Sequence, residues 1–233
     1  LQFALILLIT PAQTAGVISS EREMQTLDLL LCTKMSPFSI IIGKLLSSLA
    51  FILLLIISSI PLFSLVFLFG GIAPEDIAML FLFYIITAFA VGSIGIFYSV
   101  LFKRTVVSTV VSYITIFFLG IVSVILGVYL MSIHYSQIPR PSDYYVPLIF
   151  YINPAIGLSD LLFRQAGVTA PNAYYGILAW LFGVGLGSGS PQGWFQSLPL
   201  WIANSVVMSG IAVLLLCAST WLIRPYKRLG RKS

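Results

Sequence analysis

Residues 19–44 read SSEREMQTLDLLLCTKMSPFSIIIGK, and this stretch between two long apolar runs decides the fold. Ser20 and Glu23 have the S-x-x-E spacing of a capping box, which predicts that a helix begins here. Polar residues recur on one side of the helical wheel and leucines on another. The stretch therefore predicts a short amphipathic helix over 20–33 between two membrane spans. Ser36-Pro37 then predicts the start of a new helix.

The composition around this stretch is that of an integral membrane protein. Hydrophobic residues make up 59% of the chain and charged residues only 8%, and the mean hydropathy is +1.07. Soluble domains carry about a quarter charged residues. The apolar runs exceed the roughly 20 residues that cross a bilayer as a helix, so we expect an all-α polytopic transmembrane bundle.

The apolar runs divide the chain into five spans within a single transmembrane domain, residues 1–233. Pro11 and Pro61 are expected to kink the first two spans. Small residues at the centre of the third span let helices approach closely, and we favour packing within the subunit over a subunit interface. The five spans cover about 1–19, 36–70, 77–102, 105–133 and 199–223.

Residues 134–198, before the last span, have a different character. Prolines interrupt the segment, and its many Tyr and Trp residues suit a membrane interface. Two shorter apolar pieces, 145–163 and 173–185, are each marginal for a crossing, so we expect re-entrant or interfacial helices here. Asp160 and Arg164 have i,i+4 spacing, most simply a surface salt bridge. GLGSGS, at 185–190, is typical of a flexible turn or a linker.

The distribution of basic residues orients the spans. Lys and Arg are enriched on the cytoplasmic side of membrane proteins. Placing residues 20–35 inside puts ten of the 12 Lys and Arg on the inside and leaves only Arg140 and Arg164 outside. The segment 134–198 is then extracytoplasmic, and the basic C-terminal tail is cytoplasmic. Two extra crossings through the shorter apolar pieces would preserve this result.

The amphipathic stretch and the start of the helix after it resemble the cytoplasmic loop of ABC transporter type-2 permeases. The family pattern is E-x-E, then T-L-[ED]-x-L-L, T-x-x-[SP] and G-K, and the resemblance is closest to the branch labelled multicopper-enzyme maturation. The matching positions in this chain are Glu21, Glu23, Thr26, Leu27, Asp28, Leu30, Leu31, Thr33, Ser36, Gly43 and Lys44. In this chain Tyr151-Ile152-Asn153-Pro154 is also similar to an Asn-Pro sequence found before the last span of the family.

The resemblance implies a permease subunit of an ATP-driven exporter in the prokaryotic cytoplasmic membrane. Type-2 permeases resemble six-span proteins with both termini inside, so one further span is expected upstream of Leu1. The helix over 20–33 would be the coupling helix that docks on an ABC ATP-binding subunit, with Leu29 as its apolar plug. The implied contact residues are Glu21, Arg22, Glu23, Gln25, Thr26, Asp28 and Leu29. A second permease copy or paralogue is implied, because two ATPase subunits need two docking sites.

No motif for catalysis or nucleotide binding is present in the sequence. No Asp or Glu lies within a predicted span core, which argues against an ion-coupled transporter. We expect no cofactor in this chain, with ATP and Mg²⁺ bound by the partner subunit, and contact with membrane lipids but not with nucleic acid. The cargo could be amphiphilic. Two alternatives remain: a non-transport membrane anchor or assembly protein, and a passive channel.

Overall fold

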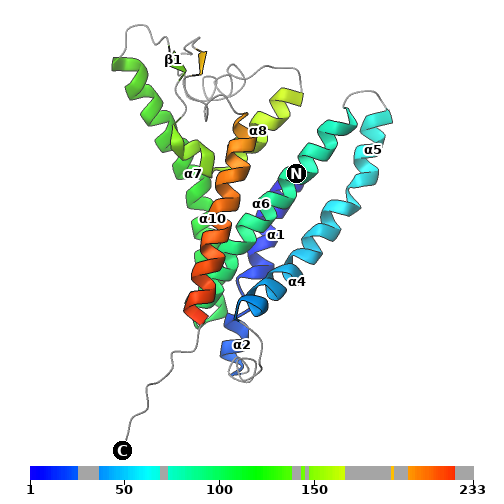
Figure 1. The fold of residues 1–233 in the computed structure, drawn as a ribbon, viewed down its shortest axis with the longest axis vertical. Helices are drawn as coiled ribbons and strands as arrows, with labels where there is room; N and C mark the ends of the chain where they lie inside the picture. Colours follow the sequence, from blue (N-terminus) through cyan, green and yellow to red (C-terminus); the bar gives the residue numbers. More distant parts are fainter. Residues whose placement is uncertain are drawn as a thin grey trace, which may run out of the picture. The chain divides into compact units, whose positions relative to one another are not determined.

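The computed structural model describes residues 1–25, 37–68, 73–137, 143–144, 147–165, 190–191 and 199–223. These residues are almost entirely helical (Figure 1). The helices are α1 (Gln2–Thr14), α2 (Ser19–Glu23), α4 (Pro37–Ser58), α5 (Ile60–Leu68), α6 (Pro74–Leu101), α7 (Thr105–Gln137), the 3₁₀ helix η1 (Leu148–Ile152), α8 (Pro154–Gln165) and α10 (Leu200–Ile223). The only strands among these residues, β1 (Asp143–Tyr144) and β2 (Ser190–Pro191), form one parallel two-residue pair.

Five helical segments of the described chain are long and apolar enough to cross a membrane. They are Gln2–Glu23, Pro37–Phe63, Pro74–Leu101, Thr105–Leu130 and Leu200–Ile223. Each overlaps one of the five spans expected from the sequence. The predicted all-α polytopic fold class is therefore confirmed.

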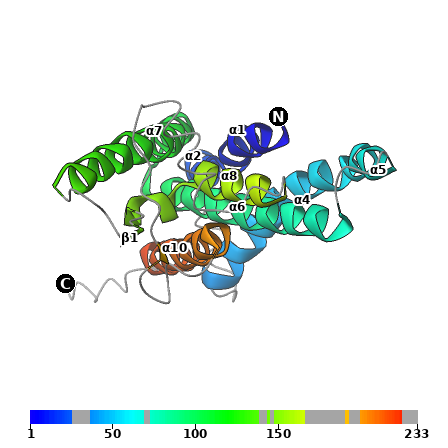
Figure 2. The same cartoon turned by 90° about the horizontal axis from the view of Figure 1, so that it is seen from above.

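Prolines set several helix boundaries: the one at Pro37 was expected, whereas the third span was expected to begin only at about residue 77. α4 begins at Pro37 and α6 at Pro74, the first helical position, where the missing N–H costs nothing. α4 and α5 are separated only by Ser59, two residues before Pro61. Figure 2 shows the two helices one after the other. Because Pro61 has no N–H to donate, the helix is interrupted there, and the Ser59 hydroxyl donates to the Ile56 carbonyl at 2.6 Å. This break is the irregularity that Pro61 predicted in the second span.

The chain folds into two compact units, and four long helices contribute to both. Unit 1 comprises Leu1–Leu55, Ala88–Ile114 and Ile211–Ser233, and unit 2 comprises Ile56–Thr87 and Thr115–Gly210. The expectation of a single transmembrane domain stays a prediction.

Unit 1 is packed around small residues of α6. A Cβ added at Gly95 would lie 2.0 Å from Thr14 Oγ1, and one at Gly92 would lie 3.1 Å from Leu45 Cδ1. Because Gly92 and Gly95 have no side chains, α6 can pack closely against α1 and α4. The small residues of the third span serve packing within the subunit, as expected.

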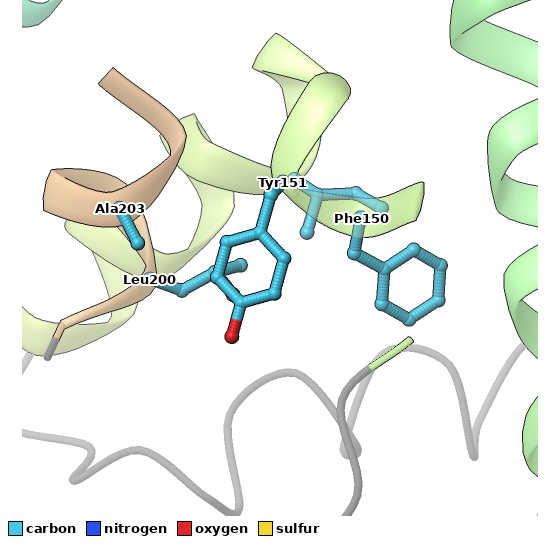
Figure 3. Packing of buried hydrophobic residues seen from close by; sticks show 5 residues of the cluster. Phe150, Tyr151, Leu200 and Ala203 are labelled. Atoms are coloured by element: carbon cyan, nitrogen blue, oxygen red, sulfur yellow. The ribbon is translucent and has the colours of Figure 1, made fainter. Parts of the chain in front are cut away.

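Unit 2 has an apolar cluster where η1 meets α10. Its buried members are Phe150, Tyr151, Ile156, Leu200 and Ala203. Figure 3 shows Tyr151 beside Leu200 of α10, while Phe150 points to the other side. Phe150 reaches α7, because a Cβ on Gly127 would lie 1.9 Å from its ring.

α8 is too short to cross a bilayer. Its 12 residues span about 18 Å at 1.5 Å per residue, against roughly 30 Å of hydrocarbon. That α8 is a re-entrant or interfacial helix stays a prediction. The second short apolar piece, 173–185, and GLGSGS at 185–190, apart from Ser190, lie outside the described residues.

Candidate functional site

Four of the seven residues predicted to contact a partner lie in the described chain. Glu21, Arg22 and Glu23 form most of α2, and Gln25 follows it. Thr26, Asp28 and Leu29 lie outside the described residues. The geometry of the site is therefore that of α2 and of the helices of unit 1 that it contacts.

The predicted capping box at the start of α2 is wrong. The N-cap position is Ile18, which makes no side-chain capping hydrogen bond, and Ser20 lies inside the helix. The capping acceptor comes from α6: the Ser99 hydroxyl oxygen accepts the backbone N–H of Ile18 at 2.8 Å and of Ser19 at 3.0 Å. Since these two amides are satisfied by α6, Glu23 is available for another partner.

Glu23 bonds to the first residue of α7. Its carboxylate accepts the Thr105 backbone N–H at 3.0 Å through Oε1 and the Thr105 hydroxyl at 2.7 Å through Oε2. The first amides of a helix have no intrahelical acceptor and carry partial positive charge. Glu23 therefore caps α7 from a segment 82 residues away in the sequence.

Arg22 bonds to the last turn of α6. Its Nη1 donates to the Val100 carbonyl oxygen at 3.0 Å. Carbonyls in the last turn of a helix lack intrahelical donors and form the negative end of the helix dipole. A guanidinium is therefore well matched to this position in both hydrogen bonding and charge.

Glu21 forms an ion pair with Lys44 of α4. The two side chains are 19% and 29% exposed, so the pair is screened by solvent only in part. Lys44, a position of the family pattern, therefore has its ammonium beside a carboxylate of α2. Consecutive charged residues of α2 thus bond to three different helices: α4, α6 and α7.

The turn that precedes α2 is bonded to the same helices. The Ser108 hydroxyl of α7 donates to the Ala15 carbonyl at 2.7 Å. A Cβ on Gly16 would lie 3.1 Å from Thr105 Cγ2, so the turn is in close contact with the start of α7. The end of α1, α2 and the adjoining ends of α6 and α7 form one hydrogen-bonded junction.

The end of α2 differs from the predicted helix over 20–33. α2 ends at Glu23, and Gln25 has a φ of 58°, in the left-handed region that interrupts a right-handed helix. Residues 20–33 are therefore not one continuous helix through Gln25. Met24 is 74% exposed, and Gln25 is also exposed. The exposed side chains of Met24 and Gln25 thus come directly after the charged side chains that bond within the junction.

Sequence reasoning missed the partners of α2. Ser99, Val100 and Thr105 were not singled out, because two of them contribute backbone groups that no residue pattern reveals. A signal was nevertheless present: Lys103-Arg104 marks a tight break between two spans. Such a break leaves a free carbonyl end and a free amide end close together.

Unit 2 contains a second polar network, centred on Asn153. Its Nδ2 donates to the Gly120 carbonyl at 2.9 Å and to Ser123 Oγ at 2.8 Å, and its Oδ1 accepts the Ala155 N–H at 2.9 Å. Asn153 is thus the N-cap of α8, with Pro154 at the first helical position. Asn204 of α10 donates to the carbonyls of Tyr151 and Asn153 at 2.7 and 3.0 Å.

The predicted Asp160–Arg164 pair forms, but it is not a surface salt bridge. Arg164 Nε lies 3.0 Å from Asp160 Oδ1, and the Asp160 side chain is 0% exposed. Its other oxygen accepts the backbone N–H of Trp201 at 3.0 Å, in the first turn of α10. Asp160 is buried because it links α8 to the start of α10, which spacing along one helix does not reveal.

The fold and the loop geometry define a polytopic α-helical membrane protein. The family described as ABC-2 family transporter protein matches residues 2–221. The chain belongs to this family of ABC transporter permeases and is a multi-pass membrane transport subunit, a class that works with an ABC ATP-binding subunit. No curated protein and no solved structure matches the chain significantly.

Proposed function

We propose that this chain is the permease subunit of an ATP-driven exporter in a prokaryotic cytoplasmic membrane. A separate ABC ATP-binding subunit would hydrolyse ATP with Mg²⁺ and drive the permease between inward- and outward-open states. Family membership supports the permease role. The bias of basic residues toward one side supports a cytoplasmic C-terminus.

The bonding of α2 to three helices is the observation that carries the coupling part of this proposal. Glu21, Arg22 and Glu23 tie α2 to α4, α6 and α7. A force applied to the segment that follows α2 would therefore reach three candidate spans at once. A membrane anchor has no need of such connections, because apolar contact with lipid is enough to hold it.

The first candidates for contact with the ATP-binding subunit are Gln25, Thr26, Asp28 and Leu29. They follow the residues of α2 that bond within the chain, and Gln25 is exposed. A dimer of permeases, either two copies or a paralogous pair, would supply the two docking sites that two ATPase subunits require. The apolar, exposed faces of the spans would contact lipid and suit an amphiphilic cargo.

Co-purification tests the proposal. The permease would be expressed with the ATP-binding protein encoded beside it, solubilised in mild detergent and captured by a tag. We expect the ATP-binding protein to be retained by the wild type and by Glu75→Arg, an exposed acid in the first turn of α6. We expect Asp28→Arg to lose it while the permease still elutes as a folded species.

Either of two results would contradict the proposal and support one of the alternatives. If Asp28→Arg retains the ATP-binding protein as the wild type does, the segment after α2 is an interfacial anchor. If the purified permease alone conducts ions in a planar bilayer without any ATPase, it is a passive channel. Either result would remove the exporter assignment.

A further inference from the structure

The connection between α6 and α7 leaves two helix ends close together. α6 ends at Leu101 and α7 begins at Thr105, so only Phe102, Lys103 and Arg104 join them. We call these three residues the elbow. The last carbonyls of α6 and the first amides of α7 lack intrahelical partners, and they carry partial charges of opposite sign.

Two adjacent residues of α2 satisfy one group on each side of the elbow. Arg22, the cation, takes the Val100 carbonyl of α6, and Glu23, the anion, takes the Thr105 amide and hydroxyl of α7. Each charge has the sign that its helix end favours. Exchanging the two residues would put each charge against a helix end of its own sign, so the order Arg-Glu is matched to the elbow.

α6 bonds back to the start of α2. The Ser99 hydroxyl accepts the Ile18 and Ser19 amides. α2 is therefore held at both ends: its first amides by α6, and its last side chains by the end of α6 and the start of α7. Helix α2 has only five residues, so the bonds at its two ends lie within about one and a half turns of each other.

We propose that Arg22 and Glu23 are positioning residues that bind the elbow to α2, rather than residues that dock on the ATP-binding subunit. A displacement of the segment after α2 then moves the end of α6 and the start of α7 together. The inference rests on the proposed function and deepens it, since it names the connection through which the two helices receive the movement. Glu23 is exposed, as Met24 and Gln25 are. The bonding groups of Arg22 and Glu23, however, are directed to the chain's own helices.

Hydrogen–deuterium exchange on the permease bound to its ATP-binding subunit tests this connection. Exchange would be measured before and after trapping with ATP and vanadate, on peptides that cover 18–25 and 100–108. In the wild type we expect trapping to change exchange in both peptides. In Glu23→Ala we expect the partner to be retained and the peptide 18–25 to respond, while the response of 100–108 is clearly reduced, since Arg22 alone still bonds to the elbow side of α6.

A conservative variant and a matched control separate this role from a general structural one. Glu23→Gln keeps an oxygen for the Thr105 amide, so it should restore the response of 100–108. Glu75→Ala removes an exposed acid from the first turn of α6 and should behave as the wild type. Failure of Gln to restore the response would show that the bond to Thr105 is not what transmits it.

The outcomes distinguish failure of this inference from failure of the proposed function. If Glu23→Ala loses the ATP-binding subunit, Glu23 is a docking residue and the inference is overturned. The inference is also overturned if 100–108 responds in Glu23→Ala as it does in the wild type. If the wild-type permease itself fails to retain the ATP-binding protein, the proposed function fails first.

Discussion

The polar networks of the two units solve the same problem with different residues. In unit 1, charged side chains of α2 satisfy backbone groups at the ends of α6 and α7. In unit 2, the amides of Asn153 and Asn204 satisfy backbone carbonyls beside η1 and in α7. Both asparagines are 1% exposed, whereas Glu23 is exposed.

The difference follows from access to water. An unsatisfied backbone group in an apolar environment costs several kcal/mol, so each helix end needs a partner. A charge provides a stronger hydrogen bond, but burying it is costly, so charges serve where water reaches. Neutral side-chain amides satisfy the backbone groups that water does not reach. Asp160 is the exception, because its buried carboxylate is neutralised by Arg164, whose side chain is 37% exposed.

The largest effect is expected from Asn153→Ala in unit 2. The substitution removes two donated hydrogen bonds and the cap of α8, which should destabilise the protein by about 2–4 kcal/mol. Thermal unfolding of the purified permease in detergent should show a clearly lower midpoint. Ser159→Ala is the control, since within the described part of the chain the Ser159 hydroxyl bonds to the Ile156 carbonyl of its own helix and to no other group. Equal shifts for both variants would contradict the central place given to Asn153.

A smaller effect is expected at the exception, Asp160. Asp160→Asn keeps an oxygen for the Trp201 amide but removes the ion pair, at a cost of about 1 kcal/mol because the freed Arg164 can turn toward solvent. Asp160→Ala removes both and should cost about 2 kcal/mol. In the same thermal unfolding measurement, Asp160→Ala should have a lower midpoint than Asp160→Asn. If the two variants unfold together, the bond to the first turn of α10 contributes nothing measurable.

The smallest effect on stability is expected at the Glu21–Lys44 pair of unit 1. Lys44→Glu sets two carboxylates against each other and should cost about 1 kcal/mol or less, since both side chains are partly exposed. The double exchange Glu21→Lys with Lys44→Glu should recover the loss, and added salt should reduce the difference between single variant and wild type. Absence of recovery in the double variant would mean that the pair contributes no coupling energy between α2 and α4.

Features local to the sequence were predicted well, and features that join distant segments were not. Pro37 begins a helix as expected, because a missing N–H acts within its own turn. Pro74 also begins one, three residues before the expected start of the third span. The capping box at Ser20 and Glu23 failed for the opposite reason: the first amides of α2 and the Glu23 carboxylate bond to Ser99 and Thr105, about 80 residues away. Asp160 and Arg164 pair as their spacing predicts, yet the burial of Asp160 depends on α10.

The sequence alone determined the class of this protein: five apolar helices, an all-α membrane fold and the charged loop of an ABC-2 permease. Hydropathy, proline positions and a short motif suffice for this, since each acts over a single span or turn. Only the tertiary structure decided that Glu21, Arg22 and Glu23 bond to α4, α6 and α7. The physical reason is that backbone carbonyls and amides are the same in every residue, so only the packing of the helices determines which of them a charged side chain meets.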